Sequence, residues 1–154
     1  FAQSATALVA VPDGFVAAWP EAKEAQDGSS VIRVARLDRA GVVQAGPVEV
    51  RRRAKNVDEV EPTLLPFGDE VALLWGKGTH IYICGGCMPD TTVELVLLDP
   101  ATLDPRSSVA TLAPGKAGGF LRRQATVAGT TLLTTFEVTF HVSMTPGSAA
   151  FSCE

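Results

Sequence analysis

The two histidines of this chain are the side chains best suited to bind a metal ion. His80 and His141 each lie five residues after the aromatic residue that ends a short apolar run, and Glu24 lies at the same distance after a third such residue. Two imidazoles and a carboxylate on one face could bind Cu or Zn. We take Glu24, His80 and His141 as candidate ligand-binding residues, with the two histidines as candidate metal ligands. Solvated loop histidines, or histidines with an unspecified role in binding, are the alternatives.

Two cysteines follow the first histidine in the segment Cys84-Gly85-Gly86-Cys87. The spacing from His80 to Cys84 and Cys87 could serve a zinc or copper site. No helix start follows, as a redox dithiol would need, and no histidine follows the second cysteine, as a c-type haem would need. We expect a disulfide between Cys84 and Cys87 in an oxidising compartment, with metal ligation and free thiols as alternatives. Cys153 is either free or paired with a cysteine outside this sequence.

Nucleophilic and acid–base catalysis have little support in the sequence. It contains no Gly-x-Ser-x-Gly elbow and no phosphate-binding glycine loop. The acidic residues Asp58, Glu59 and Glu61 follow a basic run, which is typical of a solvated loop between strands. We assign no catalytic residue and no cofactor other than the candidate Cu or Zn ion. A non-enzymatic role is therefore favoured over an enzymatic one.

Composition narrows the class of protein. The chain has 154 residues, of which 46% are apolar and 19% are charged, enough for one domain with a hydrophobic core. The net charge of −4 argues against nucleic acid as a partner. No stretch approaches the roughly 18 apolar residues of a membrane helix, so we expect no membrane insertion.

A threefold repeat must position the candidate residues. In each repeat a turn leads into a short apolar strand that ends in an aromatic residue, at Trp19, Trp75 and Phe136. The pattern thus recurs at nearly equal steps along the chain, and such self-similarity is typical of repeat architectures. Self-similarity of this kind, with few helical signals, indicates the blades of a β-propeller. We expect the three aromatic side chains to pack between neighbouring blades, with stacking on a sugar or a peptide as the alternative.

The repeats cover approximately residues 1–55, 56–117 and 118–154 of a single all-β unit. Short apolar runs and turn signals locate the strands of each repeat, and apolar and basic residues partly alternate in the strand at 31–37. The expected strands are 5–11, 15–19, 31–37 and 42–50, then 63–66, 71–75, 92–98 and 107–112, then 123–127, 131–136 and one more before residue 154. The sequence thus predicts two full four-stranded blades and most of a third.

The second repeat contains an insertion. Leu37-Asp38 of the first repeat corresponds to Leu98-Asp99 of the second, and the step between these two turns is longer than the step between the two tryptophans. Five extra residues therefore lie between the second and third strands of the second repeat, where the two neighbouring cysteines stand. In a propeller, loops at this position share one face with the blade-to-blade connections, and that face usually carries the ligand site.

Three segments carry the pattern. The first is an apolar strand that ends in a tryptophan, and the other two contain the Leu-Asp pair at which a strand ends and a turn begins. These segments are Phe15-Val16-Ala17-Ala18-Trp19, Ile32-Arg33-Val34-Ala35-Arg36-Leu37-Asp38 and Leu97-Leu98-Asp99-Pro100-Ala101-Thr102. The pattern resembles bacterial secreted β-propeller repeat proteins. The resemblance implies a propeller-like fold and a secreted or periplasmic location. A β-sandwich of about eleven strands is the competing fold.

Propellers typically close with about four to eight blades, so fewer than three blades would leave open flanks. We therefore expect the chain to be part of a larger propeller or assembly, with a protein or the rest of the propeller as its partner. The expected function is a binding or scaffold module that acts through the face of the inter-strand loops. A metal-binding protein or metal-dependent enzyme that uses His80 and His141, and a structural subunit of a multi-chain assembly, are the alternatives.

Overall fold

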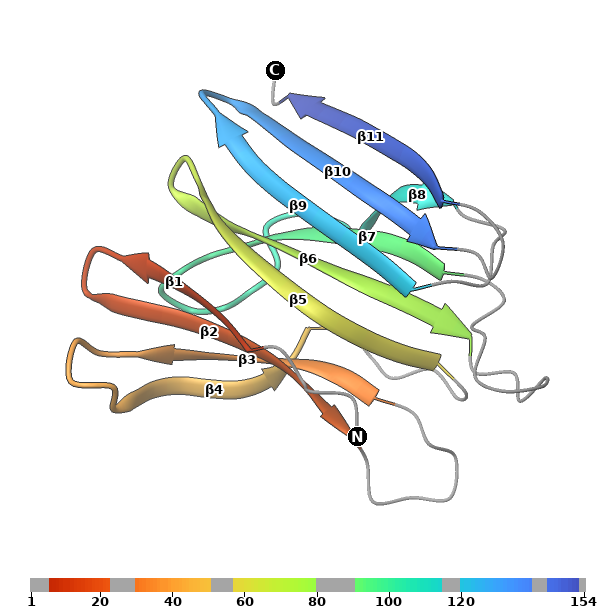
Figure 1. Cartoon of the computed structure of the whole chain (residues 1–154). Coiled ribbons are helices and arrows are strands. Elements are labelled where there is room, and N and C mark those ends of the chain that lie inside the picture. The colour runs from red at the N-terminus through yellow and green to blue at the C-terminus, as the bar shows by residue number, and fades with distance from the viewer. Residues whose placement is uncertain are drawn as a thin grey trace.

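The computed structural model of the chain describes residues 6–22, 30–50, 57–79, 91–114, 120–139 and 144–152. Within these ranges the regular structure is entirely β-strand, and no helix is long and apolar enough to cross a membrane. Figure 1 shows the strands in chain order. They are β1 (Ala7–Val11), β2 (Gly14–Ala22), β3 (Ser30–Leu37), β4 (Val43–Glu49), β5 (Val57–Phe67), β6 (Glu70–Thr79), β7 (Thr91–Leu98), β8 (Ala110–Pro114), β9 (Phe120–Ala128), β10 (Thr131–Thr139) and β11 (Met144–Ser152).

The strands form three antiparallel sheets. The first sheet has the order β1-β2-β3-β4, the second has the order β5-β6-β7-β8, and the third has the order β11-β10-β9. Neighbouring strands in each sheet are consecutive in the chain, as in the four-stranded blades of a propeller. The prediction of two four-stranded blades and most of a third is confirmed. The competing prediction of a β-sandwich is wrong, because three sheets form instead of two.

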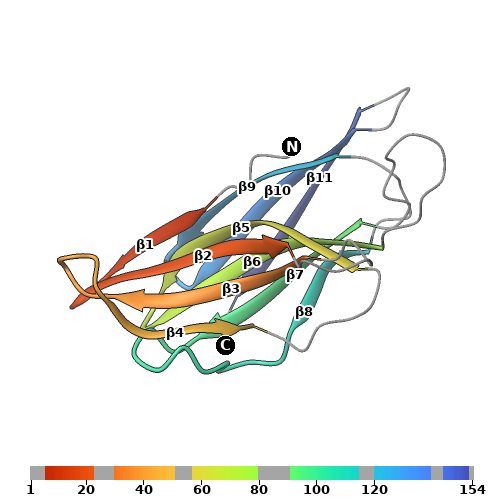
Figure 2. The same cartoon turned by 90° about the horizontal axis from the view of Figure 1, so that it is seen from below.

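The three sheets are stacked with the second sheet in the middle (Figures 1 and 2). The first strand of the second sheet, β5, contacts the first strands of both other sheets, β1 and β9. The first strands therefore lie side by side along one edge of the stack. This is the propeller-like arrangement, in which the first strands of successive blades lie nearest the central axis.

Each sheet has two faces, because successive side chains of a strand point to opposite sides. We call the face that carries Trp19 in the first sheet, Trp75 in the second or Leu132 in the third the front face, and the other one the back face. The back face of the first sheet and the front face of the second share one hydrophobic cluster. Its main members are Val9, Val16, Ala18, Ile32 and Val34 from the first sheet, and Leu64, Val71, Leu73, Trp75, Val96 and Leu98 from the second.

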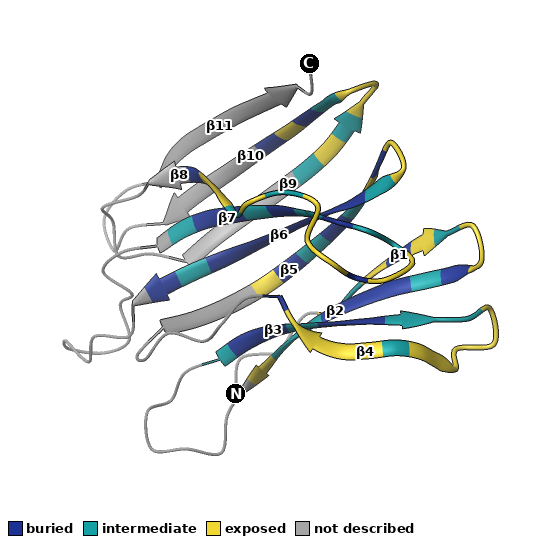
Figure 3. Ribbon diagram, turned by 180° about the vertical axis from the view of Figure 1, so that it is seen from behind, coloured by how far each residue is buried: buried dark blue, intermediate teal, exposed yellow. Residues whose placement is uncertain are grey.

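A second cluster joins the back face of the second sheet to the third sheet. Its members are Phe67, Ala72, Leu74, Val93 and Leu112 from the second sheet, and Leu132 from the third. The second sheet is thus buried on both faces, and Figure 3 shows β6 dark blue along most of its described length. The outer strand β4 of the first sheet is mostly exposed. Because Trp75 is 0% exposed in the first cluster, the predicted packing between blades is confirmed for Trp75. Trp19 is partly exposed and belongs to neither cluster, and the side chain of Phe136 lies outside the described residues.

Strand β5 begins well before the residue that the sequence predicts. We expected the first strand of the second repeat over 63–66, with Asp58, Glu59 and Glu61 in a solvated loop. This is wrong, because all three acids lie in β5, which pairs with β6 from Val57 onward. A charged segment can form a strand when it extends an established hairpin, since the partner strand satisfies its backbone hydrogen bonds. The basic run before it, 51–53, lies outside the described residues.

The predicted Leu-Asp turns form in the same way in both complete sheets. The Oδ1 atom of Asp38 accepts hydrogen bonds from the backbone N–H groups of Ala40 at 2.9 Å and Val42 at 2.8 Å. The Oδ1 atom of Asp99 accepts from Ala101 at 2.6 Å and from a second backbone N–H at 3.2 Å. An aspartate that bonds the backbone two residues on is a common initiator of turns. These side chains therefore end the third strand of each sheet.

Candidate functional site

The antiparallel order brings many strand ends to one end of the stack, which we call the connection end. There β2, β6 and β10 end, β3, β7 and β11 begin, and β5 and β9 start the second and third sheets (Figures 1 and 2). The opposite end, which we call the hairpin end, holds the tight turns that join the first two strands of each sheet. The sequence-based expectation that second-to-third strand loops share a face with the blade connections agrees with this topology.

The candidate residues that the sequence suggested all lie outside the described residues. Glu24 follows the end of β2, and His80 follows the end of β6. His141 lies between β10 and β11, and Cys84 and Cys87 lie between β6 and β7. The ligand, metal and disulfide assignments for these residues stay predictions. The connection end is where the flanking strand ends lie, so the side chains described there define the surroundings of the candidate site.

A buried polar network lies near the connection end of the second sheet. Glu94 stands opposite Trp75 in the β6–β7 pairing, and it is 4% exposed. Its Oε1 atom lies 3.5 Å from the Nζ atom of Lys77 and accepts hydrogen bonds from the hydroxyls of Thr92 at 3.3 Å and Thr111 at 3.4 Å. The carboxylate is thus held by side chains of three adjacent strands, its own among them. It stabilises the sheet from inside and is not open to a substrate.

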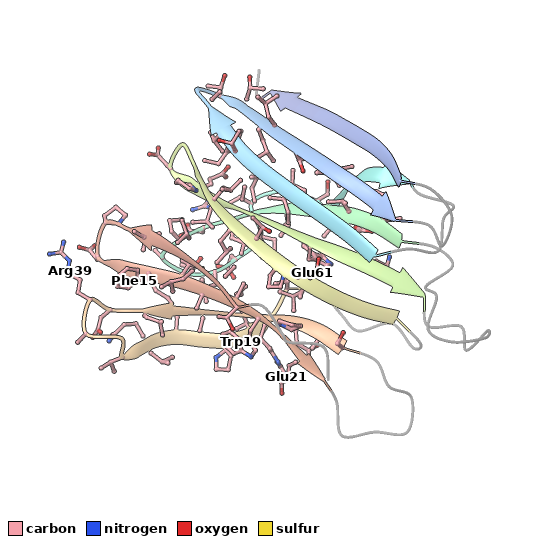
Figure 4. The ribbon with its side chains drawn as sticks, in the orientation of Figure 1. Phe15, Trp19, Glu21, Arg39 and Glu61 are labelled. Carbon is pink, nitrogen blue, oxygen red and sulfur yellow. The ribbon has the colours of Figure 1, made fainter. Side chains whose placement is uncertain are left out.

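The first sheet has a network at the same place. Arg33 stands opposite Trp19 in the β2–β3 pairing and opposite Glu49 in the β3–β4 pairing. The guanidinium group of Arg33 lies 2.5 Å from the carboxylate of Glu21 and 3.3 Å from that of Glu49. Trp19 and Glu21 project from neighbouring parts of β2, as Figure 4 shows. This network is partly exposed, since 26% of the Arg33 side chain is accessible.

The two networks occupy equivalent positions with the charges reversed. At the step between the two tryptophans, Glu21 corresponds to Lys77. At the step between the two Leu-Asp turns, Arg33 corresponds to Glu94. The third sheet departs from the pattern, because the aromatic residue that ends its apolar run stands opposite Gly147, which has no side chain. The first two sheets therefore share a site for an ion pair beside a tryptophan. In the first sheet the second strand carries the acid and the third strand the base, and in the second sheet this order is reversed.

Glu61 is a feature of the connection end that the sequence analysis assigned to a solvated loop and not to a site. The pairing of β5 with β6 shifts between Val60 and Thr63, so Glu61 and the following proline stand opposite Trp75 as a β-bulge. Glu61 adopts φ 51° and is exposed, and Figure 4 shows it on β5. Bulges often redirect a side chain next to a functional site. A proline inside a strand was the available signal, because proline in a sheet is found at edges and bulges.

The clearest electrostatic effect lies at the hairpin end instead. The pKa of the Asp99 carboxyl is lowered, first by the backbone N–H of Ala101, and then by the side chain of Arg106 and the backbone N–H of Thr102. These contacts favour the charged form of Asp99 because they donate hydrogen bonds to it. The role of Asp99 is therefore to stabilise a turn.

The described side chains of the connection end can contact a ligand or stabilise the sheets. Within the ranges that the structure describes, no group of three His, Cys, Asp or Glu residues lies close enough to hold a metal ion. The indole N–H of Trp75 is buried and has no acceptor. Of the acids described at this end, Glu94 is buried in its network, whereas Glu61 and Glu21 are exposed. The described part of the site therefore offers charged and aromatic contacts around the candidate loops.

No protein family description matches the chain, and no curated protein matches it. Among solved structures, the crystal structure of a thermostable family-43 glycoside hydrolase is similar, with a TM-score of 0.64 and 10% sequence identity. The similarity covers 95% of this chain and 49% of that chain, so this chain spans about half the length of the hydrolase. The hydrolase has a five-bladed β-propeller fold. At this identity the likeness shows the fold alone, and the chain has a propeller-like fold.

Proposed function

We propose that this chain is a binding or scaffold module of a secreted or periplasmic bacterial protein, and that it acts through its connection end. The observation that carries the proposal is the gathering of strand ends at that end. The strand ends described there flank the segments 23–29, 51–56, 80–90, 115–119 and 140–143. Rigid sheets that hold several loops side by side are a common way to build a binding surface.

The side chains around these segments support contact with a polar ligand. Glu61 is exposed on the first strand of the second sheet, and Glu21 is exposed near the end of β2. The similar solved structure is named as a glycoside hydrolase, so carbohydrate polymers are the ligand class to test first.

The test is binding to a panel of soluble polysaccharides by affinity gel electrophoresis. The chain is compared with a variant that lacks residues 85–88 and with a control variant, Arg39→Ala, at the hairpin end (Figure 4). We expect the deletion to abolish retention by the bound polysaccharide, while Arg39→Ala and the circular dichroism spectra of all three proteins stay unchanged. Equal retention of the deletion variant would place the ligand elsewhere, and no retention of the parent chain would remove carbohydrate from the proposal.

A further inference from the structure

Two sheet faces of this chain are not covered by any part of it that the structure describes. One is the front face of the first sheet, where Leu8 is 58% exposed and Phe15 and Trp19 are partly exposed. Figure 4 shows Phe15 and Trp19 along β2 on this sheet. The other is the back face of the third sheet, where Leu133 is 40% exposed.

The front face of the first sheet repeats the front face of the second, residue by residue. At the repeat steps, Leu8 corresponds to Leu64, and Trp19 corresponds to Trp75. Further equivalent pairs are Phe15 with Val71, Ala17 with Leu73, Ala35 with Val96, and Leu37 with Leu98. The front face of the second sheet is covered, so Leu64 is only 7% exposed, compared with 58% for Leu8. The large side chains of this face are thus covered in the second sheet and exposed or partly exposed in the first, where the small Ala17 and Ala35 are buried.

The back face of the third sheet repeats a covering surface in the same way. Leu133 corresponds to Ala72, which lies in the second cluster, and its partner across β9–β10 is Thr126. Thr126 and the nearby Ala128 are exposed. The side chains described on this face are small or of medium size, whereas the open front face carries Phe15 and Trp19. In the internal interface, the large Trp75 likewise shares a cluster with the small Ala18.

We propose that a second copy of this chain covers both open faces. The front face of the first sheet of each copy packs on the back face of the third sheet of the other, which repeats the geometry already present between the first and second sheets. A head-to-tail contact of this kind closes when its rotation brings the last surface onto the first. Two copies form a closed ring of six sheets, within the range of about four to eight that propellers use.

One feature of the chain favours a second copy over an unrelated partner. Both complementary surfaces stand on the same chain, one on each flank, and each continues an interface that the chain forms internally. The proposal does not depend on which ligand the connection end binds.

The test is the solution mass of the 154-residue chain by analytical ultracentrifugation over a range of concentrations. We expect a concentration-dependent species of twice 16.1 kDa. Trp19→Glu and Leu133→Glu should each raise the dissociation constant about 100-fold or more, because each places a charge at the centre of a desolvated contact. Val42→Glu, at an exposed valine in the turn before β4, is the matched control and should leave the mass unchanged.

Mixing the two variants gives the sharpest result. Trp19→Glu retains an intact third sheet and Leu133→Glu retains an intact first sheet, so the mixture can form one of the two contacts and should recover the doubled mass. A chain that stays at 16.1 kDa overturns the proposal. So does a dimer that Leu133→Glu leaves intact, since that dimer would pair two first sheets. If a variant fails to fold, concentration-dependent protection of residues 14–19 from hydrogen exchange in the parent chain decides, and its absence overturns the proposal.

Discussion

The two tryptophans form a matched pair for measuring how much the burial of one sheet by another contributes to the free energy of unfolding. Trp75 is 0% exposed between the first and second sheets, whereas Trp19, at the equivalent position, is partly exposed. Removing a fully buried indole of about 200 Å² at about 25 cal/mol per Å² gives about 5 kcal/mol. Measured Trp→Ala changes in cores are about 3–5 kcal/mol. We expect Trp75→Ala to lower the free energy of unfolding by about 4 kcal/mol, and Trp19→Ala by about 1–2 kcal/mol.

The assay is urea unfolding, with thermal melts as a second measure, at concentrations where the chain is monomeric. The slope of the unfolding free energy against urea should be the same for both variants, so that the midpoints report stability alone. For a chain of this size, Trp75→Ala should lower Tm by about 8–16 °C. Equal losses for the two variants would refute the reasoning, because they would mean that the front face of the first sheet is already covered within a single chain.

Two further predictions concern charged groups. Lys77→Met should lower the free energy of unfolding by about 1–3 kcal/mol, because it removes a cation from the buried carboxylate of Glu94. In the double variant Lys77→Met, Glu94→Gln, the loss of unfolding free energy should be smaller than the sum of the losses in the two single variants. Additive losses would contradict the contact. Asp99→Asn should lower Tm at neutral pH. Because the pKa of Asp99 is lower in the folded chain than in the unfolded chain, the difference in Tm between the variant and the parent chain should narrow as pH falls from about 3.9 through the folded pKa. Melting curves from neutral to acidic pH check this, and a difference independent of pH would exclude the carboxylate as the cause.

Much of the fold could be predicted from the sequence, because the repeat fixes which strands pair. The short apolar runs that end in Trp19 and Trp75 place β2 and β6, and the Leu-Asp turns place the ends of β3 and β7. The start of β5 was missed, since its charges suit a loop and only the pairing with β6 makes it a strand. The different burial of the two tryptophans could not be predicted either, because their local sequences are alike and only the neighbouring sheet differs.

The surroundings of the candidate site depend on register, which spacing alone does not set. Arg33 meets Glu21 and Glu49 across two strand pairs, one of which contains register shifts. The network around Glu94 also joins three strands. Two of these strands, β6 and β7, are linked by a connection that is longer than the one between β2 and β3. Aligning the repeats could have paired Arg33 with Glu94, but it could not have shown that one is buried. The site residues predicted from the sequence, His80 among them, stay predictions.

The equivalence of the sheet faces has a consequence for how such a chain evolves. A duplicated repeat brings with it both a front face and a back face that fit its neighbours, so a gene can gain or lose whole sheets without inventing a new interface. Equivalent positions beside the apolar residues can then differ in residue type. Positions 33 and 94 are an example, since arginine stands opposite Trp19 and glutamate opposite Trp75 at the same place in the first and second sheets.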